Sequence, residues 1–515
     1  MRSVDERWAL RAADQRALDE RAAASGLEQD ELMESAGTSA ADWMLRRIRP
    51  RRAVVLVGPG GNGGDGLVVA RRLREAGADV EAFSLVPMED CSPATRRMAV
   101  RLESAGGSVR SASDEGLRNA LRQVDCVVDA LFGSGLGRPL VGEALHVVKR
   151  INACSARIVS LDLPSGLASD RGEMLGDAVR ADVTLAMAFL KPAHLLYPAA
   201  GQCGNTAVVD VSYPRAVLGT AEPWARVLEP AGIRARLPAR RPDGHKGTFG
   251  RVLVVAGSIG MTGAAILCCR GALRAGAGLV CLAIPASLDP ILETALPEVI
   301  TIPLGDKDGR LRDVDDSRLD DELARADAVA LGPGLSRDPG ALDAARAIVE
   351  RFPGPIVLDA DGLHALVGHA HLLAQLAGRA ILTPHPGELA ALIGVAPEAV
   401  DASRRDQARS FAALHRVVLV LKGRPTAIGT PEGGVYLNPT GHDGLGTGGS
   451  GDVLAGLITG FVAGGASLVD AALVGAYVHG LAAEIFSRDR AARALTPSDL
   501  LDRIPTALWE VERCG

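Results

Sequence analysis

The sequence is poor in aromatic residues and in lysine. Phe, Trp and Tyr make up 3% of its 515 residues, whereas hydrophobic residues make up 47%. A composition so rich in small aliphatic residues is typical of helices packed on buried parallel sheets, and the length indicates more than one domain. The basic residues are almost all arginine, and 56 basic against 62 acidic residues give a net charge of −6. This balance gives no reason to expect binding to nucleic acid.

The sequence also lacks the patterns of zinc sites, disulfide frameworks and membrane spans. Its eight cysteines are scattered, with no CxxC pair and no Cys/His cluster. Reduced thiols agree with a cytoplasmic protein. The first residues are charged rather than apolar, and the two long uncharged runs, 252–269 and 453–469, are interrupted by Gly, Ser or Thr. We therefore expect a cytoplasmic protein that binds neither membranes nor nucleic acid.

A Walker A sequence is absent too, which excludes a P-loop NTPase. A different glycine-rich loop, 446–451, leads into an apolar helix expected from Val453 onward. The backbone N–H groups of such a loop and the helix dipole favour an anion. Asp452, which follows the loop, is then placed to take a proton from a hydroxyl that attacks a phosphate. The alternative is a tight turn with Asp452 as a helix N-cap, but capping does not require so many glycines.

The first half of the chain alternates strands with helices. Residues 53–57 predict a buried strand, and the loop 58–66 that follows has the GxGxxG spacing of a dinucleotide-binding turn. This loop is longer and more polar than such a turn usually is. Asn62 and Asp65 add side-chain oxygens, which favour a bound ion or a ribose.

Two later strands of the first half also end in polar residues. Asp129 lies at the end of the strand expected at 126–131, and Asp162 and Ser165 follow the strand expected at 158–161. Loops at the carboxyl ends of parallel strands meet in one crevice, so we expect these side chains to lie close together. Each acid alone could simply form a turn.

These motifs together resemble the NAD(P)H-hydrate epimerase domain over roughly the first 215 residues. The resemblance rests on residues 33–37 (MESAG), 61–66 (GNGGDG), 129–136 (DALFGSGL) and 162–166 (DLPSG). It implies that Asp162 is the acid/base and that Asn62, Asp129 and Ser165 hold K⁺. It further implies that two loops contact the hydrated dinucleotide, through Gly61, Asn62, Gly63, Gly64, Asp65, Gly133, Ser134, Gly135, Leu136, Gly137, Arg138 and Pro139. The chain departs from the family pattern at Ser35 and Gly61, where Asn is usual.

Residues 213–245 contain five prolines and a cluster of arginines, which indicates a domain boundary. We predict a first domain at 1–217, a linker at 218–234 and a second domain at 235–515. Each domain is expected to be an α/β sandwich of the αβα type, Rossmann-like in the first and ribokinase-like in the second.

The second half repeats the pattern of polar residues after apolar strands. Lys422 follows a strand expected at 417–421 and can neutralise a nucleotide phosphate, although a solvated lysine in a turn is the alternative. His385 is a candidate substrate contact, or else a turn residue between two prolines. Asp359 and Asp361 could help to hold Mg²⁺ through waters, or could simply form a turn.

This half resembles the ribokinase-like ADP- or ATP-dependent NAD(P)H-hydrate dehydratase from residue 235 on. The resemblance rests on residues 246–250 (KGTFG), 262–264 (TGA), 331–334 (LGPG), 359–361 (DAD), 383–388 (TPHPGE), 422–423 (KG) and 448–452 (GGSGD). It implies contacts from Ala264, Gly334, His385 and Asp452 to the hydrated nucleotide. It implies contacts to ADP or ATP from Lys422, Gly423, Arg424, Pro425, Thr426 and Gly451. His442 stands where the family more often has Asn.

The two resemblances imply one bifunctional repair enzyme for NADHX and NADPHX. The first half would interconvert the R and S hydrates with the help of K⁺. The second half would use ADP or ATP and Mg²⁺ to phosphorylate the S hydrate, with Asp452 as base, and loss of phosphate would restore NAD(P)H. We expect a homo-oligomer. Two alternatives remain: a kinase of a small alcohol, or an NAD-dependent dehydrogenase in the first half.

Overall fold

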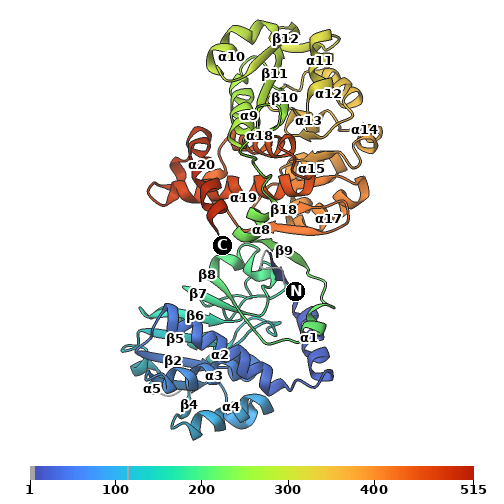
Figure 1. Ribbon diagram of the computed structural model, residues 1–515. Coiled ribbons are helices and arrows are strands. Elements are labelled where there is room, and N and C mark those ends of the chain that lie inside the picture. Colours follow the sequence, from blue (N-terminus) through green and yellow to red (C-terminus); the bar gives the residue numbers. More distant parts are fainter. Residues whose placement is uncertain (1–5, 113–114, 515) are drawn as a thin grey trace. The chain divides into compact units, whose positions relative to one another are not determined.

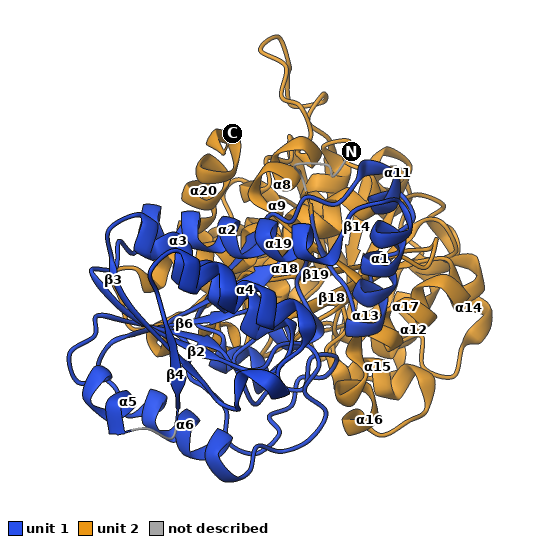
Figure 2. Ribbon diagram, turned by 90° about the horizontal axis from the view of Figure 1, so that it is seen from below, with its two compact units in different colours: residues 1, 7–224 blue, residues 2–6, 225–515 orange. Residues whose placement is uncertain are grey.

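The computed structural model describes residues 6–112 and 115–514. The chain forms two compact units, one from Arg7 to Trp224 and one that contains Glu6 and the residues from Ala225 on (Figure 2). The second unit thus begins within residues 218–234, which the sequence assigns to a linker. Strand β9 (Ala225–Leu228) and helix α8 (Pro230–Arg236) lie in or overlap this segment. The domain limits 1–217 and 235–515 remain predictions.

The first unit contains a parallel sheet in the order β4-β3-β2-β5-β6-β7-β8. The strands are β2 (Arg52–Val57), β3 (Asp79–Ser84), β4 (Val109–Ser111), β5 (Cys126–Ala130), β6 (Arg157–Leu161), β7 (Val183–Met187) and β8 (Asn205–Val209). A further short strand, β1 (Glu6–Ala9), is not part of this sheet. Strands β2 and β5 are apolar and buried along nearly their whole length, because helices cover both faces of a parallel sheet.

The helices of the first unit lie on both faces of its sheet (Figure 1). They are α1 (Ala12–Ala24), α2 (Gln29–Arg47), α3 (Gly61–Glu75), α4 (Pro93–Ser104), α5 (Glu115–Ala120), α6 (Gly142–Asn152) and the short α7 (Arg215–Leu218). Val55 of β2 packs with α2, α3 and α4, whereas its neighbours Val54 and Leu56 pack with α5 and α6. This period-two alternation produces the predicted αβα sandwich.

The sheet of the second unit has the order β9-β19-β18-β17-β16-β15-β14-β10-β11-β12-β13. Its strands are β10 (Arg251–Val255), β11 (Leu279–Pro285), β12 (Ile300–Lys307), β13 (Arg310–Asp313), β14 (Ala328–Leu331), β15 (Ile356–Leu358), β16 (Ala380–Leu382), β17 (Val418–Leu421), β18 (Thr426–Gly429) and β19 (Val435–Asn438). The central strands are parallel, while β13, β18 and β19 form antiparallel pairs. The predicted α/β class with parallel sheets is confirmed.

Helices α9, α18, α19 and α20 form one large apolar core with the second sheet (Figure 1). Helices α11 and α17 pack on the same sheet but lie outside that core. The helices are α9 (Thr262–Arg274), α10 (Asp289–Ala295), α11 (Ser317–Arg325), α12 (Pro339–Arg351), α13 (Asp361–His364), α14 (Ala370–Gln375), α15 (Pro386–Ile393), α16 (Pro397–Ala402), α17 (Arg404–His415), α18 (Ser450–Ala463), α19 (Leu468–Ser487) and α20 (Pro497–Arg513). Helix α19 is long and apolar enough to span a membrane, but 78% of its most apolar stretch is buried within the structure.

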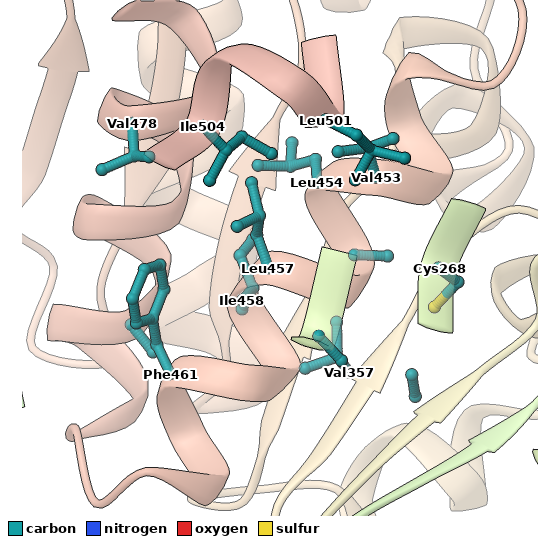
Figure 3. Packing of buried hydrophobic residues seen from close by; sticks show 14 of the residues in the cluster. Cys268, Val357, Val453, Leu454, Leu457, Ile458, Phe461, Val478, Leu501 and Ile504 are labelled. Carbon is teal, nitrogen blue, oxygen red and sulfur yellow. The ribbon is translucent and has the colours of Figure 1, made fainter. Parts of the chain in front are cut away.

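Helices α9 and α18 approach each other closely, and Val453, Leu457 and Phe461 of α18 fill the core beside this contact (Figure 3). Gly456 makes the approach possible, because a Cβ atom there would lie 2.0 Å from the backbone oxygen of Cys268. The backbone of α9 cannot yield as a flexible side chain could. This packing fixes α18, whose first turn carries Asp452.

We expect Gly456→Ala to destabilise the second unit by about 2 kcal/mol or more, because the new methyl group overpacks a helix–helix contact. Gly263→Ala is the matched control: it lies in α9, where a Cβ atom would meet no other atom within 4 Å, and its backbone is one that alanine tolerates. It should be neutral or stabilise by up to about 1 kcal/mol. Urea unfolding of both variants measures the difference. Equal midpoints would contradict the close-packing account.

Candidate functional site

The first unit has a pocket of about 380 Å³ at the carboxyl ends of its strands. The chain leaves β2 toward β3 on one side and later returns on the other side as β5, so the crevice opens between these two strands. Ligands of open α/β sheets bind at such switch points. The pocket is lined by the loops that follow β2, β5 and β6, among other residues: Pro59, Gly60, Gly61, Asn62, Asp65, Leu131, Phe132, Gly133, Ser134, Gly135, Leu136 and Asp162.

Asp162 follows β6 directly and has a positive φ of 61°, which is unusual for a residue other than glycine. One carboxylate oxygen, Oδ1, accepts a hydrogen bond from the Lys191 ammonium at 2.5 Å. The other, Oδ2, accepts from the backbone N–H of Ser134 at 2.9 Å. Burial alone would raise the pKa of the Asp162 carboxyl, but the charge and hydrogen bond of Lys191 outweigh it and lower the pKa. Asp162 is therefore held as a carboxylate.

Lys191 is fully buried and also donates to the carbonyl oxygens of Met187 (3.3 Å) and Phe189 (3.1 Å). After Lys191 and Ser134, His194 is the third residue that holds Asp162 in position. Its Nδ1 accepts from the Lys191 backbone, so Nε2 carries the proton and donates to the Asp162 carbonyl at 2.7 Å. Burial and the nearby ammonium lower the pKa of His194 to about 4. Sequence reasoning assigned no role to Lys191 or His194, although a lysine in an arginine-rich chain was a usable signal.

Asn62 and Asp65 lie at the start of α3 and line the same pocket. Both polar atoms of the Asn62 amide are buried, and none of the described residues hydrogen-bonds to them. Burial, together with the charges on Asp162 and Asp19, raises the pKa of the Asp65 carboxyl well above its usual value. The pocket thus contains one ionised carboxylate, one carboxyl that favours its neutral form, and one amide free to bind a ligand.

Asp129 and Ser165 also come together, as expected, but they bind each other. The Ser165 hydroxyl donates to Asp129 Oδ1 at 2.6 Å, and the Ser165 backbone N–H donates to Oδ2 at 2.9 Å. Ser160 and the Leu131 backbone supply further donors to the two oxygens. Burial raises the pKa of Asp129 in spite of these bonds. The Ser165 oxygen additionally accepts from the Phe132 backbone, which ties the pair to the loop after β5.

Some residues of the two predicted loops do not line the pocket. Gly63 and Gly64 instead let α3 pack closely, since a Cβ at Gly63 would lie 2.0 Å from the Gly58 carbonyl oxygen and one at Gly64 would lie 2.3 Å from the Met33 sulfur. Gly137, Arg138 and Pro139 are likewise not among the residues that line it. Their predicted contacts with the dinucleotide remain predictions.

The second unit has a corresponding switch point between β10 and β14. The loop after β14 meets the loop after β10 there. Gly257 donates its N–H to Pro333, and the Ser258 hydroxyl donates to the Gly334 carbonyl. Gly334, with a φ of 62°, lies against α9, because a Cβ at this position would approach the Ala264 Cβ to 2.9 Å. The two predicted substrate contacts Ala264 and Gly334 are therefore neighbours.

Lys422, Asp359, Gly451 and Asp452 gather at the carboxyl ends of β15 and β17. The Lys422 ammonium donates to Asp359 Oδ1 at 2.8 Å and lies 3.7 Å from Glu388. Thr383 donates to the same Asp359 oxygen at 2.9 Å. A Cβ at Gly451 would lie 3.3 Å from the Lys422 ammonium, which places the glycine-rich loop beside this cation.

Asp452 lies in the first turn of α18, which begins after Gly449 in a left-handed conformation (φ 98°). Helix N–H groups of the first turn have no partner within the helix and point toward the loop. Burial and the charge of Asp359 raise the pKa of Asp452 to about 7, against the opposing effect of Lys422. A carboxyl with this pKa can accept and release a proton near neutral pH.

His385 is the N-cap of α15. Its Nδ1 accepts from the backbone N–H groups of Gly387 and Glu388, and its own backbone donates to Glu388 Oε2 at 2.8 Å. More than half of the side chain (56%) is exposed. The other ring nitrogen, Nε2, lies 3.4 Å from Glu388 Oε1. The predicted substrate contact of His385 stays a prediction.

The remaining predicted nucleotide contacts form the connection from β17 to β18, which runs from Lys422 to Thr426. Gly423 has a φ of 156° and Arg424 is exposed. The Thr426 hydroxyl donates back to the Gly423 carbonyl at 3.1 Å. Asp361, in contrast, accepts from the Ser336 backbone N–H at 2.8 Å and lies 3.5 Å from Arg337. Among the described residues, no group of three or more His, Cys, Asp and Glu side chains is arranged to hold a metal ion.

Comparisons with known proteins cover both units. The family described as NAD(P)H-hydrate dehydratase matches residues 252–506, and the YjeF-related protein N-terminus matches residues 29–193. The bifunctional NAD(P)H-hydrate repair enzyme Nnr of Moorella thermoacetica is 40% identical over 93% of this chain and 92% of its own length. The chain belongs to the family of bifunctional NAD(P)H-hydrate repair enzymes. The protein of the same name from Thermofilum pendens is 38% identical over 97% of this chain and 95% of its own.

Solved structures resemble the second unit. The ADP/ATP-dependent NAD(P)H-hydrate dehydratase of Bacillus subtilis, co-crystallised with ATP and Mg²⁺, is 32% identical, with a TM-score of 0.46 over 55% of this chain and 98% of that one. A ribokinase-like protein from Enterococcus faecalis is 22% identical, with a TM-score of 0.50 over 56% and 98%. The bifunctional repair assignment made from the motifs and the ribokinase-like fold are confirmed.

Lys191 and Asp162 form a buried ion pair, and the loss of unfolding free energy on removing one partner can be measured. Lys191→Met should cost about 3–5 kcal/mol, because it leaves the Asp162 carboxylate buried without a cation. The double variant Lys191→Met/Asp162→Asn should recover part of this loss, since both charges are gone. Denaturant unfolding of the single and double variants gives the coupling energy. Additive effects would contradict the ion pair.

Proposed function

We propose that the first unit interconverts the R and S hydrates of NADH and NADPH and that the second unit dehydrates the S form. The dehydration consumes ADP or ATP and releases phosphate with AMP or ADP. The observation that carries this proposal is that each unit has one carboxyl in a distinct state at the carboxyl ends of its parallel strands. Asp162 is held ionised by Lys191, whereas Asp452 has a pKa of about 7 beside a glycine-rich helix start.

In the second unit, the oxygen of the ring hydroxyl attacks the terminal phosphorus of the nucleotide, and Asp452 accepts the proton of that hydroxyl. The bond from that phosphorus to the bridging oxygen breaks, and the first-turn N–H groups and Lys422 stabilise the charge on the phosphoryl group. Phosphate then leaves with the C–O bond electrons, and loss of a proton from the adjacent ring carbon restores the double bond. We assign the hydrated nucleotide to Ala264, Gly334, His385 and Asp452.

The nucleotide is assigned to the connection from Lys422 to Thr426 and to Gly451. A Mg²⁺ ion would supply counter-charge to the phosphates here. Asp359 and Asp361 would hold it through waters. This agrees with their geometry, because Asp359 Oδ1 is already bonded to Lys422 and Thr383.

In the first unit, the Asp162 carboxylate acts on the ring hydroxyl. The reduced nicotinamide ring contains an enamine, and its hydration places the hydroxyl on the carbon next to the ring nitrogen. Removal of the hydroxyl proton breaks the bond from that carbon to nitrogen, which then takes a proton and leaves an aldehyde. Rotation and ring closure by the reverse steps give the other epimer. Lys191 and Ser134 hold the carboxylate oriented for both directions.

The residues assigned to K⁺ fit the ion unequally. Asn62 offers a buried amide oxygen with no donor among the described residues, and Ser165 offers a hydroxyl oxygen. The Asp129 oxygens already accept four hydrogen bonds, so Asp129 would act through Ser165 and supply negative charge. When bound, the ion would order the loops around Asn62 and Phe132.

We propose a cytoplasmic homo-oligomer whose partners are NADHX, NADPHX and ADP or ATP, with no role for nucleic acid or membranes. The acidic net charge supports the absence of a role for nucleic acid or membranes.

The direct test follows absorbance at the reduced-nicotinamide band after the protein, Mg²⁺ and ADP or ATP are added to mixed R and S NADH hydrate. The whole band should return. Asp162→Asn should return only the S share, beyond slow spontaneous epimerisation, because the variant lacks the base of the first unit. Phosphorylation of a small alcohol with no band recovery would instead favour a kinase. Full recovery of both epimers by Asp162→Asn would remove Asp162 from its role.

Dehydration by the second unit should depend on the ionisation of Asp452. Because the pKa of this base is about 7, the rate should fall roughly tenfold per pH unit below 7 and reach a plateau above it. Asp452→Asn should reduce dehydration of the S hydrate by at least about 10²-fold and leave epimerisation intact. Initial rates on S hydrate across pH 5–9 measure both. A pH-independent rate in the wild-type protein would contradict the assignment.

A further inference from the structure

A second cavity, of about 330 Å³, lies next to the polar pocket of the first unit. Four residues line both: Gln15, Asp19, Asp65 and Met187. The two cavities therefore share a wall, named here the shared wall. Beyond it, the second cavity is lined mainly by apolar groups from α2 and the strand ends, including Leu32, Met33, Ala36, Val211 and Tyr213. Asp162 lines the polar pocket but not this second cavity.

The shared wall presents hydrogen-bond acceptors. The Gln15 amide nitrogen donates to the Met187 carbonyl at 3.4 Å, and a hydrogen bond from Gln15 lowers the pKa of the Tyr213 phenol, which burial raises. The Tyr213 hydroxyl in turn donates to Asp19. These bonds fix the orientation of the Gln15 amide. Its oxygen, Oε1, is buried and has no donor among the described residues.

Asp65 adds a second polar group to the wall, and in its neutral form its carboxyl offers one acceptor oxygen and one O–H donor. Within the described part of the chain, no hydrogen-bond donor or cation within ion-pair distance meets its carboxyl, in contrast to Asp162 with its lysine and its backbone N–H. A buried acceptor without a donor costs about 1–3 kcal/mol, which a ligand N–H group can offset. The wall therefore favours a neutral ligand that carries N–H groups, next to an apolar surface that suits a planar ring.

We propose that the shared wall binds the carboxamide of the hydrated nicotinamide, with Gln15 Oε1 accepting its N–H, and so directs the ring hydroxyl to Asp162. This inference rests on the proposed epimerase function. Hydration places the hydroxyl on the ring carbon opposite the one that bears the carboxamide. The two groups point in opposite directions, so a site must recognise them at opposite ends. Asp162, which lines only the polar pocket, and Gln15, which lines both cavities, supply the two separate contacts that such a ligand needs, and Gln15 is a specificity-determining residue.

The test compares two substrates that differ only in this donor. One is the hydrate of NADH, and the other is the hydrate of the 3-acetylpyridine analogue, in which CH₃ replaces NH₂. Epimer interconversion by the full-length protein is followed by chromatography without ADP, ATP or Mg²⁺, so that the second unit is silent. Wild-type kcat/KM should be at least about tenfold higher for the carboxamide substrate, because the analogue leaves a buried acceptor unpaired.

Gln15→Leu should lower kcat/KM for the carboxamide substrate about tenfold and change that for the analogue less than about threefold. Gln123→Leu is the matched control: Gln123 is exposed and lines neither cavity, so both substrates should be unaffected. Equal kcat/KM for the two substrates in the wild-type protein would overturn the inference, and this comparison needs no variant. A Gln15→Leu variant that loses both equally would overturn it as well. No interconversion of either substrate would refute the proposed function itself.

Discussion

The reversal of strand order in a parallel sheet is the constraint on which both sites depend. Strands β2 and β5 in the first unit, and β10 and β14 in the second, are neighbours whose connections run in opposite directions. The loops after such a pair separate, and the crevice between them cannot be filled by a crossover helix. Glycine-rich loops and acids placed after these strands consequently meet in one place, however far apart they lie in sequence.

The carboxyls of Asp162 and Asp452 are both buried, and the charged side chains next to each of them determine whether it is protonated. Asp162 and Asp452 are both removed from water, which raises the pKa of each. Lys191 lies 2.5 Å from Asp162 and reverses the effect. Lys422 instead donates a hydrogen bond to Asp359. The negative charge of Asp359 and the burial of Asp452 both raise the pKa of Asp452. One site therefore keeps a permanent base, and the other keeps a base that titrates near neutrality.

The sequence predicted the α/β class, the strands near 53–57, 126–131, 158–161 and 417–421, and the polar residues that follow them, because apolar runs that end in glycine or a polar residue are local signals. It could not predict contacts that depend on the register of distant segments. Lys191 reaches Asp162 across 29 positions and lies in no glycine-rich motif. Gln15 sits on a helix face, where a glutamine is normally solvated, and only the packing of α1 buries its amide oxygen. Lys246, part of a predicted motif, lies exposed in a turn.

Ser35 and His442 stand where the family usually has Asn, and hydrogen bonds of these side chains hold the local backbone in place. Ser35 accepts from the Ser212 backbone and pairs with its hydroxyl, so a short side chain suffices to tie α2 to the end of β8. His442 accepts from Gly444 through Nδ1 and binds the Ala483 carbonyl through Nε2, which holds the approach to the glycine-rich loop. A Cβ atom at Gly61 would meet only the Met33 methyl group, at 4.0 Å. Asn62 is then the one residue of 61–66 that carries a side-chain amide, and both polar atoms of that amide are buried without a partner among the described residues.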